Sequence, residues 1–122
     1  MKNILFIEDE AVLQDAFGEF LKQKGYKITK ALDGETGLRL AKSENPDLII
    51  LDLVLPNKEG FEVLRELKED EKTKDIPVIV LTNLEGIKDI DRALSSGATT
   101  YLIKTQYNME EIIEKIKKVL GE

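Results

Sequence analysis

A chain of 122 residues is the length of one domain and is long enough to bury a core. With 34% charged residues and a net charge of −6, it is poorly suited to general binding of nucleic acid or anionic membranes. It has no cysteine and no histidine, which excludes disulfides, thiol catalysis, serine-histidine triads and metal sites built on thiolate or imidazole. A bound metal would therefore be a hard cation with oxygen ligands. No membrane span or signal peptide is visible, so we expect a cytoplasmic protein.

The N-terminal third of the chain predicts two strand-helix pairs. Residues 2–7 form a short apolar strand, and residues 26–30 form a second strand after Gly25 has ended the first helix. Asp33 is predicted to cap the second helix, which runs to about Glu44. The first helix is recognised by apolar residues at helical spacing, namely Val12, Leu13, Ala16, Phe17, Phe20 and Leu21.

The middle of the chain contains an apolar run that the remaining elements are expected to surround. Residues 47–52 show no alternation and are too few for a helix, which is typical of a strand buried on both faces of a parallel sheet. Asp52 lies where this strand should end. Pro56 and Gly60 then indicate a loop, and a helix is predicted over residues 58–69.

The C-terminal part repeats the same alternation. Strands are predicted over residues 76–81 and 99–103, and Gly97 ends the helix between them. The final helix, residues 109–120, has a lysine-rich last turn that suits the helix dipole. The helix before Gly97 is marked by three apolar residues, Ile87, Ile90 and Leu94.

Strands that alternate with helices predict an α/β fold: a doubly wound, five-stranded parallel sheet with helices on both faces. Such sheets bind ligands beyond the carboxyl ends of their strands. The predicted strand ends carry three carboxylates, one hydroxyl and one ammonium group, which should therefore meet at one edge. These groups belong to Glu8, Asp9, Asp52, Thr82 and Lys104.

This combination predicts a phosphoryl-transfer site. Three neighbouring carboxylates repel one another, so we expect the pKa of at least one to be raised and a divalent cation to be favoured. Oxygen ligands and few carboxylates suit Mg²⁺. With the cation bound, Asp52 could act as a nucleophile toward phosphorus, while Thr82 and Lys104 hold the phosphoryl oxygens.

Each of these residues also has a structural alternative. Asp9 could cap the first helix, and Thr82 could be a cap or a turn residue. Lys104 could extend its aliphatic stem out of the core. Asp52 is poorly explained as a cap, because no helical pattern follows it. Tyr101 could be an ordinary strand residue, and its spacing places it on the opposite strand face from Lys104.

The whole chain resembles the receiver domains of two-component response regulators. The motifs that carry the resemblance are Glu8-Asp9, Asp52 with Pro56 and Gly60, residues 76–82 ending in Thr82, Gly97-Ala98, Tyr101 and Lys104. The resemblance implies one receiver domain over residues 1–122, with a flavodoxin-like strand order of 2-1-3-4-5.

The resemblance also implies a role for each site residue. Asp52 would take a phosphoryl group from a sensor histidine kinase or phosphotransfer protein. Mg²⁺ would be bound by Asp9, Asp52 and the backbone carbonyl of Val54, and by Glu8 through water.

Thr82 and Tyr101 would form a switch in the surface of the fourth helix, fifth strand and fifth helix. That surface would bind a downstream protein or a second copy of the chain. Enzymatic activity is expected only as self-phosphorylation and self-dephosphorylation at Asp52, and direct contact with nucleic acid or membrane is not expected.

Three residues depart from the family pattern. Thr105 replaces the proline that follows the lysine, where the family has a cis bond. A cis Lys104–Thr105 bond would cost about 2.5–4 kcal/mol, so the sequence leaves open whether the loop after the fifth strand is rearranged and where Lys104 points. Asn83 replaces a small residue after the switch threonine, and Glu8 replaces the commoner aspartate.

Two other functions remain open on the sequence. A phosphatase of the haloacid dehalogenase kind also uses an aspartate nucleophile, but it would need an acid where Val54 stands, and a cap domain. A receiver-like interaction module that is no longer phosphorylated is the stronger rival because of Thr105. The start at Met1 and the absence of a trailing linker favour a stand-alone regulator over an excised receiver.

Overall fold

The computed structural model describes residues 1–122 and contains five strands and five α-helices that alternate along the chain. The strands are β1 (Asn3–Ile7), β2 (Lys27–Ala31), β3 (Leu48–Leu51), β4 (Val78–Thr82) and β5 (Thr100–Ile103). The helices are α1 (Ala11–Gln23), α2 (Gly34–Glu44), α3 (Gly60–Glu69), α4 (Ile87–Ser95) and α5 (Met109–Leu120), with a short 3-10 helix, η1 (Lys104–Gln106), after β5.

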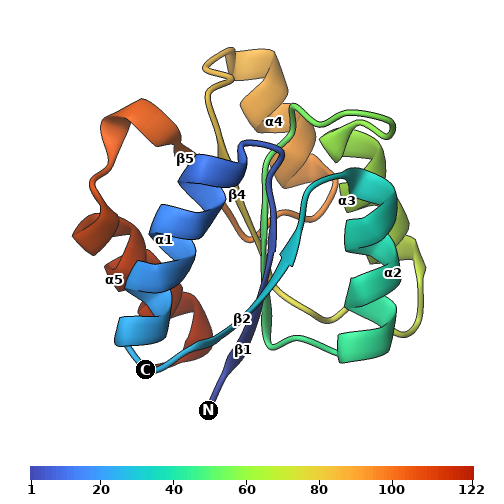
Figure 1. The fold of residues 1–122 in the computed structure, drawn as a ribbon. Helices are drawn as coiled ribbons and strands as arrows, with labels where there is room; N and C mark the ends of the chain where they lie inside the picture. The colour runs from blue at the N-terminus through green and yellow to red at the C-terminus, as the bar shows by residue number, and fades with distance from the viewer.

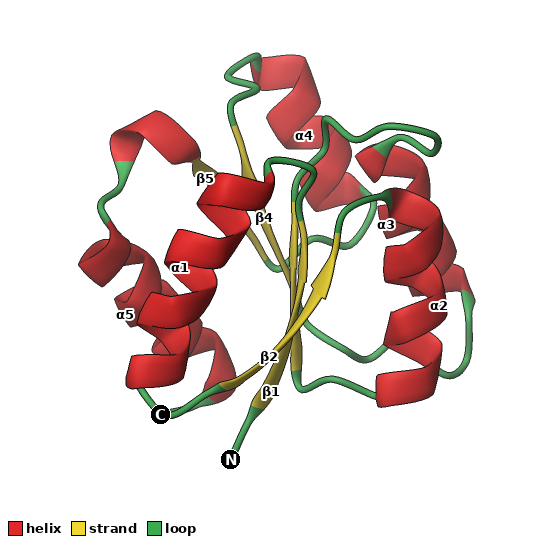
Figure 2. Cartoon of the chain, viewed as in Figure 1, coloured by secondary structure: helices red, strands yellow, loops and turns green.

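All strand pairs are parallel, and the sheet order is β2-β1-β3-β4-β5. This confirms the predicted fold class and strand order. Helices α1 and α5 cover one face of the sheet, and α2, α3 and α4 cover the other (Figure 1). The sheet is thus enclosed between two layers of helices (Figure 2). None of the helices combines the length and the apolar character that a membrane span requires.

The two faces of the sheet hold separate apolar cores, because successive strand residues point to opposite faces. On β1, Leu5 and Ile7 pack on the side of α2, α3 and α4, whereas Ile4 and Phe6 pack on the side of α1 and α5. Every residue of β3 and β4 is buried. This double burial explains why their sequences are unbroken apolar runs.

Three apolar residues that were used to predict helices are exposed. Val12 on α1 is 85% exposed, and Ile87 and Leu94 on α4 are 77% and 45% exposed. The helices themselves are present, so the spacing located them, but these three residues do not belong to the core. The only buried residue of α4 is Ala93, and its neighbour Leu94 points about 100° away around the helix.

The chain around Gly60 fixes the loop that follows β3. Helix α3 begins at Gly60, two residues later than predicted, after Asn57 in a left-handed conformation with φ of 69°. A Cβ atom on Gly60 would lie 2.3 Å from Leu53 Cα and 2.5 Å from Asp52 O. Only glycine allows this close approach of backbone to backbone, which holds the segment carrying Asp52 against the start of α3.

Candidate functional site

Polar side chains meet at the edge of the sheet where the parallel strands end. Glu8 follows β1, Asp52 follows β3, Thr82 ends β4, and Lys104 begins η1 directly after β5. The site residues predicted from the strand ends therefore come together at one edge.

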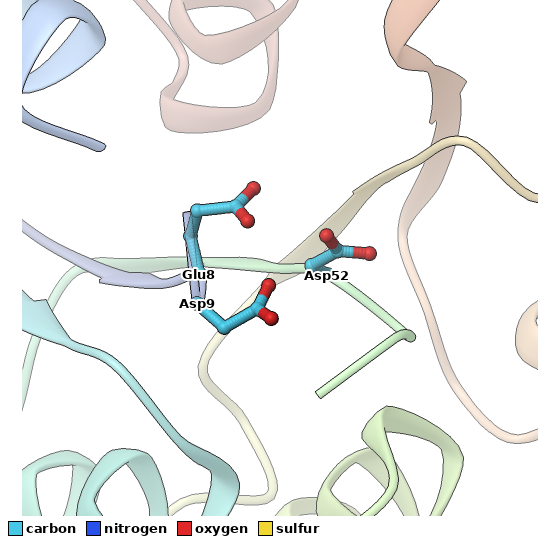
Figure 3. A group of neighbouring side chains, drawn as sticks. All are labelled: Glu8, Asp9 and Asp52. Carbon is cyan, nitrogen blue, oxygen red and sulfur yellow. The ribbon is translucent and has the colours of Figure 1, made fainter. Parts of the chain in front are cut away.

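Glu8, Asp9 and Asp52 form an acidic cluster, in which one carboxylate oxygen from each lies within 4.8 Å of the others. Glu8 and Asp9 leave the end of β1, Asp52 leaves the end of β3, and all three carboxylates reach into the same space (Figure 3). Glu8 is fully buried, Asp52 is 4% exposed, and Asp9 is exposed. Because burying a carboxylate is costly, Glu8 and Asp52 require a compensating charge.

Lys104 supplies that charge. Its Nζ lies 2.8 Å from Asp52 Oδ2 and 2.6 Å from Glu8 Oε1, while its side chain is only 11% exposed. The contact with Glu8 Oε1 is an ion pair without the alignment of a hydrogen bond. A longer contact of 3.5 Å reaches Glu10 Oε1. Lys104 thus points into the site. This rules out the alternative in which its aliphatic stem only carries the ammonium group from the core to solvent.

The loop after β5 accommodates Thr105 without redirecting Lys104. No peptide bond in the chain is cis, and residues Lys104–Gln106 form the turn η1. The Lys104–Thr105 bond, whose state the sequence left open, is therefore trans. The direction of Lys104, which was in doubt because of Thr105, is toward the site, because its ammonium contacts Asp52.

Burial raises the pKa of Glu8. Desolvation raises it from 4.5 to about 7, against the opposing effects of the Lys104 ammonium and of the Glu10 N–H. For Lys104, burial alone would lower the pKa, but its contacts with Asp52 and Glu8 outweigh burial and leave the pKa raised. The direction at Glu8 agrees with the expected rise of at least one carboxyl pKa, but its main cause is burial, and repulsion by Asp52 contributes less.

We expect Glu8 to make the protein less stable as pH rises through the acid range when metal is chelated. A carboxyl with a raised pKa in the folded state favours folding most below its unfolded pKa, near 4.5. That advantage is lost as pH rises through the folded pKa of about 7. The loss should amount to about 1–3 kcal/mol.

Urea unfolding of the parent and of Glu8→Gln at several pH values measures this effect. The difference in unfolding free energy between the two proteins should change in that window and be flat below it. A difference that is constant across the window would contradict the pKa of Glu8.

The acidic cluster opens on a cleft of about 320 Å³, lined by Asp9, Glu10, Asp52, Val54 and Asn83. The donor set fits a hard divalent cation, since it offers oxygens from three carboxylates at close range and no nitrogen or sulfur. Glu8 Oε1 is buried and faces the Lys104 ammonium at 2.6 Å, so a positive charge already lies beside these carboxylates. The residues present therefore suit Mg²⁺.

Thr82 and Tyr101 are linked through the loop that follows β4. Thr82 is fully buried, and Tyr101 Oη donates a hydrogen bond of 2.9 Å to the carbonyl oxygen of Leu84. The Leu84 N–H lies 3.5 Å from Thr82 Oγ1, at the limit of a hydrogen bond. The Tyr101 ring packs against the core on the side of α2, α3 and α4, and burial, with the charges of Asp89 and Asp52, raises its pKa.

The capping alternatives for the acidic residues are not supported. The N-cap of α1 is Glu10 rather than Asp9, and it makes no side-chain cap bond. Asp52 Oδ1 accepts a 3.1 Å hydrogen bond from the Val54 N–H within the loop, so Asp52 caps no helix. In contrast, Asp33 caps α2 as predicted, accepting a 2.8 Å bond from the Thr36 N–H.

Two residues of the site were missed by the sequence analysis. Glu10 lies at the mouth of the cleft and reaches Lys104. Gln14 is 2% exposed and donates to the backbone beneath the acidic cluster. A signal for Gln14 existed, because it is a polar residue at helical spacing from Phe17 and Leu21.

The fold and the strand-end site are those of a small α/β signalling domain. The sequence matches the response regulator receiver domain family over residues 4–117. The chain therefore belongs to this family: it is the receiver domain of a two-component response regulator. Receiver domains are signalling modules rather than ordinary enzymes, and they interact with histidine kinases and downstream targets.

Two curated relatives illustrate the range of lengths in this family. The chain is 41% identical over 120 residues to the DNA-binding dual master transcriptional regulator RpaA of Synechocystis sp., covering 98% of this chain and 49% of RpaA. It is 33% identical over 121 residues to the polar-differentiation response regulator DivK of Brucella ovis, covering 99% of this chain and 98% of DivK. The chain thus spans about half the length of the first relative and nearly all of the second.

Solved structures agree with this assignment. A CheY-like receiver domain protein from Methanospirillum hungatei superimposes with a TM-score of 0.93 at 27% identity, covering 99% of this chain and 94% of that chain. The receiver domain of a sensor histidine kinase from Pseudomonas aeruginosa superimposes with a TM-score of 0.89 at 29% identity, and the match covers 99% of this chain and 98% of that chain. That structure is described with a magnesium ion coordinated in its active site cleft.

Proposed function

We propose that Asp52 accepts a phosphoryl group from a phosphohistidine of a sensor histidine kinase or phosphotransfer protein. The observation that carries this proposal is the contact of 2.8 Å between Lys104 Nζ and Asp52 Oδ2, beside two further carboxylates. Asp52 is the carboxylate at the exit of the central strand β3, and it faces the cleft. Glu8 also contacts Lys104, but it is fully buried and does not line the cleft, whereas Asp52 does.

The transfer requires an exchange of partners at Asp52. A carboxylate oxygen attacks phosphorus, the P–N bond to the donor imidazole breaks, and its electron pair returns to the ring nitrogen. The product is an acyl phosphate. Lys104 then releases the carboxylate and binds a phosphoryl oxygen, and the Thr82 hydroxyl donates to another.

Mg²⁺ is the cation that we propose for this site. Asp9, Asp52 and the Val54 carbonyl would bind it directly, and Glu8 would bind it through water. When bound, it neutralises negative charge on the carboxylates and on the incoming phosphoryl group. Support comes from the oxygen-only acidic cluster, and from the magnesium ion described for the Pseudomonas aeruginosa receiver domain.

The phosphoryl group would act on the surface formed by α4, β5 and α5. It adds about 1.5 to 2 negative charges at neutral pH, which attract Thr82 and Lys104. Movement of Thr82 would pull on the loop at Leu84, which Tyr101 holds by its hydroxyl. The exposed Ile87 and Leu94 belong to α4, and this surface would bind a downstream protein or a second copy.

We expect a phosphate mimic to move the ring of Tyr101. Adding beryllofluoride with Mg²⁺ should break the hydrogen bond from Tyr101 Oη to Leu84 O, because the loop after Thr82 moves toward the site. NMR of ring-labelled tyrosine measures this, and Tyr26 and Tyr107 serve as internal controls. Tyr101 signals that stay in place while the site residues shift would show that the coupling is absent.

Residues 1–122 would act as a single receiver domain, in keeping with the family match over residues 4–117. The net charge of −6 favours protein partners over nucleic acid. A cytoplasmic location is the expectation that suits a kinase-dependent phosphoacceptor.

Intact-mass measurement after incubation with acetyl phosphate and Mg²⁺ tests the proposed function. We expect a stable adduct of one phosphoryl group, which chelation of Mg²⁺ prevents. Release of phosphate without an adduct would instead support the phosphatase alternative. Neither adduct nor turnover would support an interaction module that is no longer phosphorylated.

A further inference from the structure

Helix α1 carries one polar side chain on its buried face, and that side chain holds the backbone under the acidic cluster. Gln14 is 2% exposed, and its Nε2 atom donates to Ala31 O at 2.9 Å, to Phe6 O at 3.0 Å and to Glu8 O at 3.3 Å. An amide group has two protons, so the longer contact with Glu8 O shares a proton with one of the shorter bonds.

These three oxygens lie where β1 and β2 separate. The paired part of the two strands ends at Ile7 opposite Ala31, and the Glu8 N–H then donates to Ala31 O at 3.0 Å. Gln14 adds a donor at the point where the regular ladder stops. Without the amide, Ala31 O would keep only the Glu8 N–H, and Glu8 O would lose the Gln14 donor, so the chain after Ile7 would be held less firmly.

Gln14 also holds the acidic segment from its other end. Its backbone N–H donates to Glu10 O at 2.9 Å, which is the first hydrogen bond of α1. No side chain caps this helix. The segment from Glu8 to Glu10 is therefore attached to one residue at both ends, by a side chain at Glu8 and by the backbone at Glu10.

Asp9 lies between these two attachments. Its exposed carboxylate has no side-chain hydrogen bond and no ion pair, so its direction is set by the backbone on either side. Glu8, in contrast, is further held by Lys104 and by the Glu10 N–H, which donates to Glu8 Oε2 at 3.1 Å. Displacing this backbone should therefore affect Asp9 most.

We propose that Gln14 is a positioning residue for cation binding, which directs Asp9 and Glu8 toward Asp52 through their backbone. This inference rests on the proposed function, because it takes the acidic cluster to be a Mg²⁺ site. Gln14 touches neither the cation nor the phosphoryl group. Its contribution is the donor capacity of its amide at the end of the β1 ladder.

Gln14→Met is the variant that isolates this contribution, because methionine has nearly the same length and no donor. The first measurement is Mg²⁺ affinity by calorimetry, where we expect binding about 10–100-fold weaker than in the parent. The second is amide hydrogen exchange of the metal-free proteins. Exchange should accelerate at Glu8 and Glu10 but stay unchanged at the centre of β3 and β4.

Leu21→Val is the matched control, since Leu21 lies on the same helix and in the same core but not at the acidic segment. It should lower the melting temperature and leave Mg²⁺ affinity and exchange at Glu8 and Glu10 as in the parent. If Gln14→Met fails to fold, Gln14→Asn, whose amide sits one methylene further back, takes its place with the same expected direction.

The possible results test the positioning role of Gln14 and the proposed Mg²⁺ site separately. Parent protein that binds no Mg²⁺ would overturn both. Parent protein that binds Mg²⁺, with Gln14→Met binding it within twofold, would overturn the positioning role alone. Equal loss of affinity in Leu21→Val and Gln14→Met would also overturn it, because general destabilisation would then explain the effect.

Discussion

Replacing Asp52 by asparagine is expected to abolish the phosphoryl adduct that acetyl phosphate and Mg²⁺ form with the parent protein. An amide is not a nucleophile toward phosphorus, and Asp52→Asn would also deprive Lys104 of its charged partner at 2.8 Å. Intact-mass measurement detects the loss directly. The effect should be complete rather than partial, because Glu8 is fully buried and does not line the cleft, and Asp9 does not contact Lys104.

Asp91→Asn provides the control for this loss, because it removes the same charge from an exposed position on α4. It should form the adduct at the parent rate. Asp9→Asn should form it slowly, through weaker Mg²⁺ binding. An adduct of parent yield in Asp52→Asn would show that another residue accepts the phosphoryl group.

Replacing Asp9 by asparagine is expected to raise the melting temperature of the metal-free protein and to remove most of its response to Mg²⁺. Lys104 pairs with Glu8 and Asp52 but not with Asp9, so Asp9 is the carboxylate of the cluster without a positive partner. In the parent, Mg²⁺ at ten times its dissociation constant should stabilise the fold by about 1.4 kcal/mol. This corresponds to a rise of several degrees for a domain of this size.

Melting temperatures of the parent and of Asp9→Asn, each with chelator and with millimolar Mg²⁺, test this prediction. The competing explanation is that Asp9 stabilises α1, which would make Asp9→Asn less stable than the parent without metal. The structure disfavours that outcome, because the N-cap of α1 is Glu10 and Asp9 accepts no cap bond. An equal Mg²⁺ response in both proteins would remove Asp9 from the ligand set.

The sheet and its strand ends could be predicted because their physical signals are local. Strands buried on both faces must be apolar throughout, so β3 and β4 stand out as unbroken runs. The carboxyl ends of parallel strands lie at the same edge of the sheet. The residues that follow the strands therefore lie close together, even if the helix boundaries are predicted imprecisely. This is why Asp52, Thr82 and Lys104 could be placed together from the sequence.

The surface of the helices and the support beneath the site could not be predicted in the same way. Apolar spacing locates a helix but does not distinguish a core residue from an exposed contact residue, as Val12, Ile87 and Leu94 show. The role of Gln14 depends on three carbonyl oxygens from two strands and the residue that follows β1. Its contacts follow from tertiary packing that periodicity does not encode.

The effect of replacing proline by Thr105 could not be decided from the sequence. A local rule about the Lys104–Thr105 bond left the direction of Lys104 open. In the structure, the 3-10 turn η1 leaves Lys104 in contact with both Asp52 and Glu8. Attraction to two buried carboxylates thus suffices to direct the long side chain when threonine follows it.

Locating the phosphoryl group on the chain tests the central claim most directly. The parent protein is incubated with acetyl phosphate and Mg²⁺, then treated with borohydride, which reduces an acyl phosphate to the alcohol. Peptide mass spectrometry should find the reduced side chain, homoserine, in place of Asp52 and nowhere else, and none when Mg²⁺ is chelated. Reduction at another carboxylate, or an adduct that borohydride leaves intact, would contradict the assignment of Asp52 as the phosphoryl acceptor.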